Sequence, residues 1–329
     1  MLQFLNNIVV SLSQFTSLEL YEVRAMLALI TVAVACGALG SLVVGQRMAF
    51  FSDAMAHTAM AGVTLAMLFI VLAFQVRSRS DAEQYYWMLP LAMAGVGVVV
   101  GLVMAFLQQR TNLTSDTVIG VFFALSLGFA GLMMPGLQQR VRIDLDTILF
   151  GQLLFMDDLR LLILMGMTIL TLALLLWRYN SLVLGSMHGT LASSRGIATQ
   201  LNHYLFVVVL AIVVNLSIYA VGVLLINALL VVPAAAAANI SGNLRRMFWI
   251  TLVGCVACAM IGYRTAMTSQ IAIGNLVVDP GPSGAVVMTC VGWFVVSLFI
   301  RAIRKRFFGI ETTRPTGEVG HVHHAGCVH

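Results

Sequence analysis

Residues 48–74 read MAFFSDAMAHTAMAGVTLAMLFIVLAF, an apolar run that carries an aspartate and a histidine four positions apart. An α-helix rises about 1.5 Å per residue, so about 20 apolar residues are enough to cross the hydrocarbon core of a bilayer. Asp53 and His57 therefore lie inside a predicted membrane span. An ionisable pair at that depth is costly to bury, which makes it a candidate functional site.

Comparable apolar runs recur along the whole chain of 329 residues, of which 60% are hydrophobic and only 9% charged. This composition excludes an ordinary soluble domain and predicts an all-α polytopic membrane protein with eight or nine transmembrane helices. We expect an interfacial segment over 1–20, a transmembrane domain over 21–308 and a cytoplasmic, disordered tail over 309–329. The predicted spans are 22–44, 48–74, 87–107, 116–134, 159–178, 203–220, 222–240, 248–267 and 283–303.

The charges predict an orientation for these spans. The chain has 18 basic and 13 acidic residues, a net charge of +5. Cytoplasmic loops of membrane proteins collect Lys and Arg, so the basic segment after the last span, RAIRKRFF over 301–308, is placed in the cytoplasm. With nine spans the N-terminus then lies outside. The positive charge therefore reports orientation and does not predict nucleic-acid binding.

Five cysteines do not form a disulfide framework. Four of them, Cys36, Cys255, Cys258 and Cys290, lie in predicted spans, where a cysteine usually behaves as a small apolar side chain. The fifth, Cys327, belongs to the tail considered below.

Asp53 and His57 project from the same face of a helix, because four residues make slightly more than one turn. A proton shared by the two side chains, a proton relay and a bound metal ion all remain open as reasons for burying them. The surrounding residues are small, which lets another helix approach closely. If two copies of this helix met at a twofold axis, two Asp and two His would converge, a credible site for Zn²⁺ or Mn²⁺.

The polar connection between the fifth and sixth predicted spans, residues 179–202, is a candidate contact for a separate motor protein. Its glycines and polar residues suit a short cytoplasmic helix, and an ordinary surface loop is the alternative. The residues of interest over about 185–200 are Gly185, His188, Gly189, Arg195 and Gly196.

The C-terminal sequence GHVHHAGCVH concentrates side chains that can bind Zn²⁺, and an inert tail is the alternative. The candidate ligands are His321, His323, His324, Cys327 and His329.

On the opposite side of the membrane, the apolar piece TILFGQLLF at 147–155 is too short to span and is expected to dip back into the protein.

Several familiar catalytic motifs are missing from the sequence. It contains no glycine-rich phosphate-binding loop and no His-Glu-x-x-His pair. The chain is therefore not expected to hydrolyse ATP itself, and a zinc-protease reaction is not indicated.

One segment, SLVVGQRMAFFSDAMAHTAMAGVTLA at 41–66, resembles the signature of the permease family of bacterial zinc and manganese ABC importers (the ZnuB and MntB type). The resemblance covers about residues 20–305, in the order found in the family. The other segments that carry it are DTVIGVFFALSLGFAGLMM at 116–134, RIDLDTILFGQLL at 142–154, VGVLLINALLVVPAAAAANI at 221–240 and DPGPSGAVV at 279–287. Gln46 and Ser52 depart from the pattern, where the family often has Arg and Gly.

The resemblance implies a type II ABC importer (BtuC-like) permease in the bacterial cytoplasmic membrane. Its implied partners are a second permease copy or a paralogue, a cytoplasmic ABC ATPase dimer that binds ATP, and an external metal-binding protein. Asp53 and His57 match the metal-coordinating pair, and the 185–200 segment matches the coupling helix. The chain is then not an enzyme and holds no cofactor besides the transported Zn²⁺ or Mn²⁺, with zinc favoured. A permease for a metal chelate and an intramembrane metal-dependent hydrolase are the alternatives.

Overall fold

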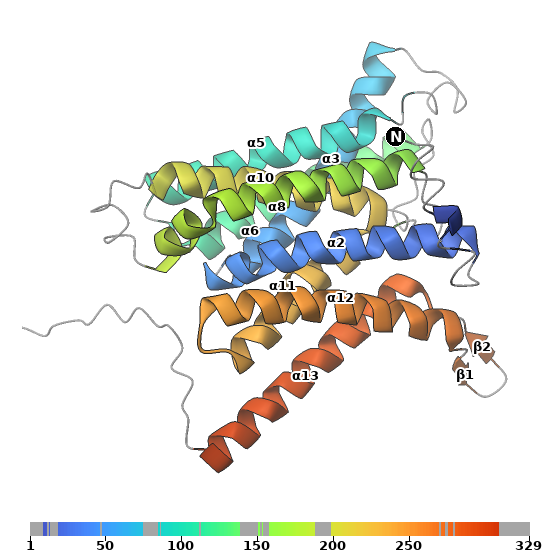
Figure 1. Cartoon of the computed structure of the whole chain (residues 1–329). Helices are drawn as coiled ribbons and strands as arrows, with labels where there is room; N and C mark the ends of the chain where they lie inside the picture. The colour runs from blue at the N-terminus through green and yellow to red at the C-terminus, as the bar shows by residue number, and fades with distance from the viewer. Residues whose placement is uncertain are drawn as a thin grey trace, which may run out of the picture.

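The structure is a computed structural model and is helical almost throughout (Figure 1). It describes residues 9–11, 13, 19–46, 48–74, 85, 87–111, 113–138, 151, 153, 158–187, 199–269, 271–273, 276–278 and 280–308. The long helices are α2 (Leu20–Gly45), α3 (Ala49–Ala73), α5 (Met88–Arg110), α6 (Ser115–Gln138), α8 (Asp158–Met187), α10 (Thr199–Val221), α11 (Val223–Ile240), α12 (Leu244–Thr268) and α13 (Pro282–Phe308).

Nine helices in the described part of the chain are long and apolar enough to cross a membrane, and they coincide with the nine predicted spans. The all-α polytopic prediction is therefore confirmed. This prediction depends on the length of the apolar runs. Helices that are apolar on most faces show little amphipathic periodicity from which a helix could be predicted. Apolar side chains on the outer faces, such as Leu132, Leu176 and Phe299, are exposed in the single chain, as expected for surfaces that face lipid.

One helix continues beyond its membrane span. The fifth apolar span ends at Arg178, as predicted, whereas the helix that contains it, α8, continues to Met187 into the predicted connection. The added residues, YNSLVLGSM, include no proline, so helix propagation continues past the end of the apolar run. Gly185, expected in the cytoplasmic connection, therefore lies in the last turn of α8.

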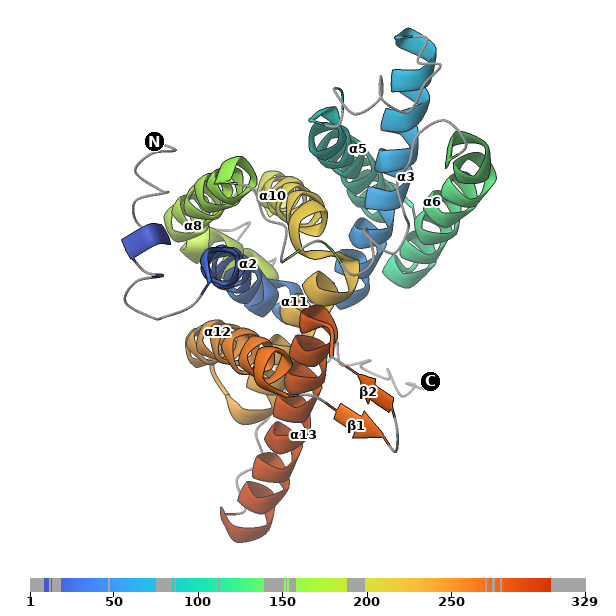
Figure 2. The ribbon, with the colours of Figure 1, turned by 90° about the vertical axis from the view of Figure 1, so that its right-hand side faces the viewer.

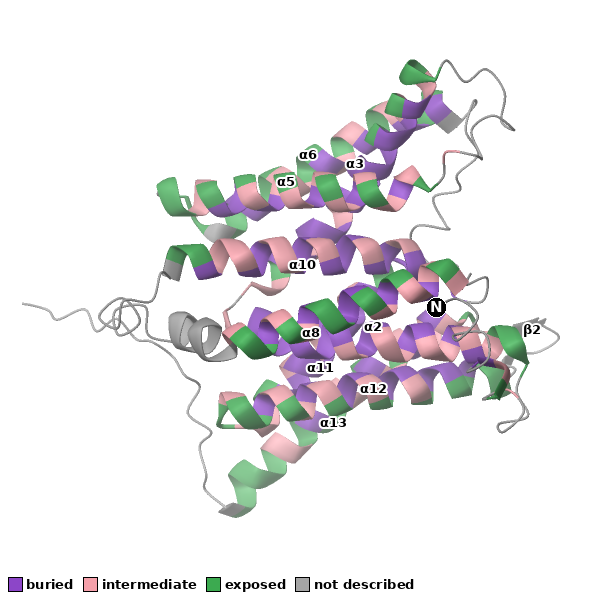
Figure 3. Cartoon of the chain, turned by 45° about the horizontal axis from the view of Figure 1, so that its top comes forward, coloured by how far each residue is buried: buried purple, intermediate pink, exposed green. Residues whose placement is uncertain are grey.

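The helices form two groups that meet along a seam (Figure 2). In the first, α3 packs against α5, α6 and α10. In the second, α2 packs against α8, α11 and α12, and α13 packs against α11 and α12. Across the seam, α10 contacts α8, and the beginning of α11 lies against α3. The four most buried helices are divided between the groups, with α3 and α10 in the first and α2 and α11 in the second. The most exposed helix is α13 (Figure 3).

Small residues bring the helix backbones into direct contact. A Cβ atom at Gly40 of α2 would overlap the carbonyl oxygen of Leu230 in α11. Without a hydrophobic driving force between helices in lipid, such close van der Waals packing is a main source of association. The small residues of α2 thus determine how closely α11 can approach the centre of the molecule.

The chain reverses direction between α10 and α11 at Gly222, whose φ angle of 94° is one that L side chains rarely adopt. The 147–155 segment, which is predicted to dip back into the protein, has two residues that the structure describes, Gly151 and Leu153. Gly151 lies against Val221 and Gly222, and the side chain of Leu153 is buried. Within the 147–155 segment, Gly151 therefore reaches the turn that starts α11.

Pro233 lies inside α11 and has no N–H group to donate to the carbonyl of Leu229, four residues earlier. The thiol of Cys255 in α12 donates to that carbonyl, with Sγ 3.2 Å from the oxygen. Cys36, Cys255, Cys258 and Cys290 are all buried and free, as predicted. Cys255 therefore stabilises the fold through packing and one weak hydrogen bond.

A two-stranded antiparallel hairpin between α12 and α13 was not predicted. Strand β1 (Ile271–Ile273) pairs with β2 (Leu276–Val278), with Ile271 opposite Val278 and Ile273 opposite Leu276. The sequence contains a signal for it, because the alternating and β-branched residues of IAIGNLVV flank a Gly-Asn pair.

Replacement of Gly40 by alanine should destabilise the protein. The new methyl group would overlap the α11 backbone, and overpacking of this kind costs about 1–3 kcal/mol. The matched control is Gly166→Ala in α8, where a Cβ would meet nothing within 4 Å. Thermal unfolding of the detergent-solubilised chain should show a lower midpoint for Gly40→Ala and an unchanged or higher one for Gly166→Ala. Equal midpoints for the two variants would contradict the close α2–α11 contact.

Candidate functional site

The structure places Asp53 and His57 on one face of α3, as the sequence predicts. The distance between His57 Nε2 and Asp53 Oδ1 is 3.8 Å, too long for a hydrogen bond. Two ligands that each lie about 2.0–2.2 Å from one tetrahedral metal ion are about 3.3–3.6 Å apart. A small side-chain movement would therefore let both bind the same ion.

The two side chains differ in their exposure. The side chain of Asp53 is 45% exposed in the single chain, and that of His57 is 19% exposed. The His57 ring meets the edge of Phe123 from α6, with ring centroids 4.5 Å apart. Since a carboxylate inside a membrane does not face lipid, the open side of Asp53 must face a pathway or another polypeptide.

The small residues of α3 allow close packing of the helix. Ser52, Ala54, Ala56, Thr58 and Ala59 are buried around the pair. One to two turns further along the helix, a Cβ at Gly62 would lie 2.8 Å from the Cα atom of Met93 in α5. The backbones of α3 and α5 are thus in contact on the side of α3 that points away from Asp53, so α3 is packed closely behind the pair.

A third polar residue at the site, Asn227 of α11, was missed by sequence reasoning. Its Nδ2 group donates a hydrogen bond to Asp53 Oδ1 at 2.6 Å. The sequence feature that could have identified it is a lone amide side chain in the apolar run VGVLLINALLVV. Polar side chains inside membrane spans usually face the protein interior. Which span it would meet could not be read from the sequence.

Two polar atoms beside the carboxylate remain without a hydrogen bond. His57 Nδ1 and Asn227 Oδ1 are both buried, and neither finds a partner among the residues that the structure describes. A buried polar atom left unsatisfied costs about 1–3 kcal/mol and calls for an explanation. The site is thus polar and only partly satisfied within one chain.

The donor set suits a divalent transition metal, since carboxylate oxygen and imidazole nitrogen bind both Zn²⁺ and Mn²⁺. No group of three His, Cys, Asp or Glu side chains that could hold a metal occurs within the described parts of this chain. The described part of a single chain therefore offers two such side chains at this place, Asp53 and His57. The alternative of an intramembrane metal hydrolase, which needs a third ligand and a base, gains no support from these residues.

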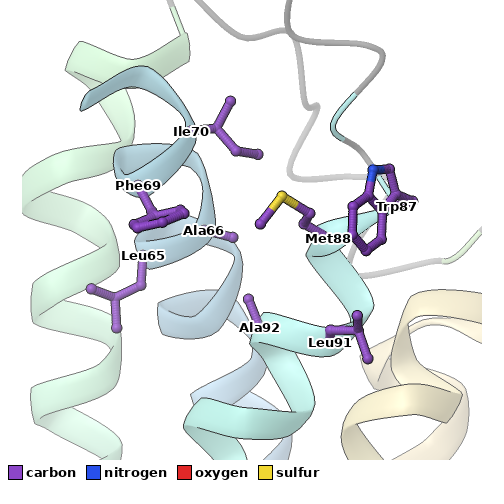
Figure 4. A pocket seen from close by; sticks show the side chains of 8 residues that line it. All are labelled: Leu65, Ala66, Phe69, Ile70, Trp87, Met88, Leu91 and Ala92. Atoms are coloured by element: carbon purple, nitrogen blue, oxygen red, sulfur yellow. The ribbon is translucent and has the colours of Figure 1, made fainter. Parts of the chain in front are cut away.

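A pocket of about 530 Å³ between α3 and α5 lies further along α3 (Figure 4). Its lining side chains are apolar, and among them only the indole ring of Trp87 carries a side-chain nitrogen or oxygen atom. The residues that line it are Leu65, Ala66, Phe69, Ile70, Trp87, Met88, Leu91 and Ala92. It has no metal ligands, and Leu65 is about 12 Å along the helix from His57, so it is not part of the Asp53–His57 site.

The remaining predicted site residues fall largely outside the described part of the chain. Of the candidate coupling residues, Gly185 lies in α8, and α10 begins at Thr199. The others lie outside the described residues, namely His188, Gly189, Arg195 and Gly196. The same is true of the tail residues His321, His323, His324, Cys327 and His329.

Comparison with known proteins gives several relatives of nearly the same length. The chain is 25% identical to the manganese import system permease protein ScaB of Streptococcus gordonii, over 86% of this chain and 92% of the relative. It is 24% identical to the manganese transport system membrane protein MntC of Halalkalibacterium halodurans (78% and 82%). It is 27% identical to the high-affinity zinc uptake system membrane protein ZnuB of Haemophilus influenzae (84% and 96%).

Solved structures share the fold. PsaBC from Streptococcus pneumoniae, in complex with Fab, superimposes with a TM-score of 0.68 at 22% identity, over 86% of this chain and 94% of the other. A putative metal-chelate type ABC transporter in an inward-facing conformation gives 0.60 at 18% identity, over 84% and 85%. The chain therefore shares its fold with both of these structures.

The model of the ABC 3 transport family matches residues 20–301. The match begins with α2 and ends within α13, so it includes the Asp53–His57 site and all nine helices. The protein is thus a membrane-spanning transport component rather than an enzyme, and it belongs to the ABC 3 transport family.

Proposed function

We propose that this chain conducts a divalent transition metal, Zn²⁺ or Mn²⁺, across the membrane as the permease of an ABC importer. The observation that carries the proposal is the position of Asp53 Oδ1 and His57 Nε2, 3.8 Å apart inside a membrane-spanning helix. The relatives named above support it, because their names specify zinc or manganese transport. The ion would pass from an external binding protein to the Asp53–His57 pair and then to the cytoplasm.

A second permease, either another copy of this chain or a paralogue, would complete the site. One chain offers two ligands, and the Asp53 side chain is nearly half exposed. If a partner presented the same face of its own α3, the two aspartates and two histidines would surround one ion. Four oxygen and nitrogen ligands satisfy a tetrahedral Zn²⁺ and leave room for water on Mn²⁺.

The donor atoms do not discriminate between the two metals. Asp and His bind both, and the Irving–Williams order places Zn²⁺ above Mn²⁺ in nearly any such site. Relatives are named for each metal. The preference for zinc rests on the histidines of the 309–329 tail and stays a prediction.

A separate ATPase dimer would provide the energy from the cytoplasmic side. The orientation predicted from the basic residues puts the α8–α10 connection in the cytoplasm. In the structure, α8 reaches Met187 and α10 starts at Thr199. The 188–198 connection is thus joined directly to two helices that meet across the seam between the helical groups, so a push on it would be transmitted to both groups.

Asp53→Asn and His57→Ala should each abolish metal uptake without preventing assembly. The first removes the negative charge and the second removes the nitrogen ligand, while neither adds volume. Uptake of radioactive zinc and manganese would be measured in cells that express the chain with its ATPase and binding protein. Asp116→Asn and His203→Ala, which change the same residue types away from the site, are the controls. Normal uptake by Asp53→Asn would sink the assignment.

A second copy at the site can be tested by cross-linking. An Asp53→Cys variant, carrying Cys327→Ser to remove the tail thiol, should be joined into a covalent dimer by a short bifunctional maleimide. The four described native cysteines are buried, so the Cys327→Ser chain alone is the control and should stay monomeric. If the variant stays monomeric in membranes where it is assembled with the ATPase, two copies of this chain do not share the site.

A further inference from the structure

Asn227 is the residue through which α11 reaches the candidate metal site. Its neighbours in sequence, Ile226 and Ala228, are buried and apolar, and it lies in the second turn of α11. The hydrogen bond from its Nδ2 group to Asp53 Oδ1, at 2.6 Å, joins residues 174 positions apart. An amide inside a membrane helix is costly unless it is paired, so this contact determines which side of α11 faces α3.

The hydrogen bond constrains the carboxylate that would bind the ion. A bond from an N–H group to an ionised carboxylate is roughly twice as strong as one between neutral groups. It holds Oδ1, the same oxygen that lies 3.8 Å from His57 Nε2, and an oxygen of this kind keeps a second lone pair for a metal. Without it, an aspartate that is 45% exposed would be free to rotate away from His57.

The same bond crosses the seam between the two helical groups. Asp53 belongs to α3, which packs against α5, α6 and α10, whereas α11 packs mainly against α2, α12 and α13. The α11 side of the contact is itself rigid, because Gly40 of α2 brings its backbone against Leu230 of α11. Asn227 therefore holds Asp53 from a helix that belongs to the other group.

We propose that Asn227 is a positioning residue of the metal transit site, which orients Asp53 toward His57 by donating a hydrogen bond to Oδ1. This inference rests on the proposed metal transport and adds a third residue to its site. Outer-shell hydrogen bonds to ligating carboxylates orient the ligand, and their loss typically weakens metal binding about 10–100-fold. Because the bond spans the seam, the geometry of the metal ligands also depends on how the two groups are placed.

The test is equilibrium binding of radioactive zinc, and separately manganese, to the full chain assembled with its ATPase in lipid nanodiscs, without the binding protein. Binding that persists in Asp53→Asn, including any contribution of the tail histidines, is subtracted as background. Asn227→Leu keeps the shape of the side chain and removes the donor. We expect it to raise the dissociation constant of the Asp53-dependent binding about 10–100-fold.

The matched control is Asn215→Leu in α10. Asn215 is also a buried amide inside a span, and its Oδ1 atom has no partner among the described residues, but its Nδ2 group donates to the carbonyl of Ala211 in its own helix. Its replacement should leave the dissociation constant unchanged. If Asn227→Leu does not assemble, Asn227→Ala removes the same donor with a smaller side chain and is measured instead.

The possible results separate the role of Asn227 from the existence of the metal transit site. Wild-type affinity in Asn227→Leu, or equal weakening in Asn215→Leu, would overturn the role of Asn227 and leave the Asp53–His57 site intact. Absence of Asp53-dependent binding in the wild-type chain would overturn the proposed transit site, and the inference with it. Weakening confined to Asn227→Leu would support the positioning role.

Discussion

The cost of holding the Asp53 carboxylate inside the membrane governs the arrangement around it. Water is absent from the hydrocarbon core, so the charge must be balanced by protein groups, by a cation or by an aqueous pathway. Here Asn227 donates one hydrogen bond to it and His57 lies close by, while nearly half of the side chain stays open. A divalent cation would supply the positive charge that the carboxylate still lacks.

Much of the fold follows from the physics of the bilayer alone. Nine apolar runs of sufficient length predict nine helices, and the described part of the chain has them at nearly the predicted positions. Asp53 and His57 could also be selected in advance, because their spacing puts them on one face of a helix wherever that helix packs. The small residues of α3 permit close helix contact, and α5 makes one at Gly62, on the side of α3 opposite Asp53; close approach on the Asp53 face itself stays a prediction.

What could not be predicted depends on which helices meet. Nothing local in the α11 sequence says that Asn227 faces Asp53, because that contact depends on the turn at Gly222, on the α2–α11 contact at Gly40 and on the rotation of both helices. The extension of α8 to Met187 was missed for a different reason. The end of an apolar run marks where lipid ends, whereas a helix ends where its backbone hydrogen bonds stop, and here the two differ.

The proposed transit site must also release its ion, and the proposed arrangement of ligands would favour release. A site built entirely within one rigid chain would hold a divalent metal through several fixed ligands. In the proposed site each chain would present two ligands on α3, and the hydrogen bond to one of them comes from the other side of a seam. Separation of two permeases would halve the number of ligands, and movement along the seam would free Asp53 from Asn227. Either change lowers the affinity without chemical alteration of any ligand, which is what alternating access requires of a binding site.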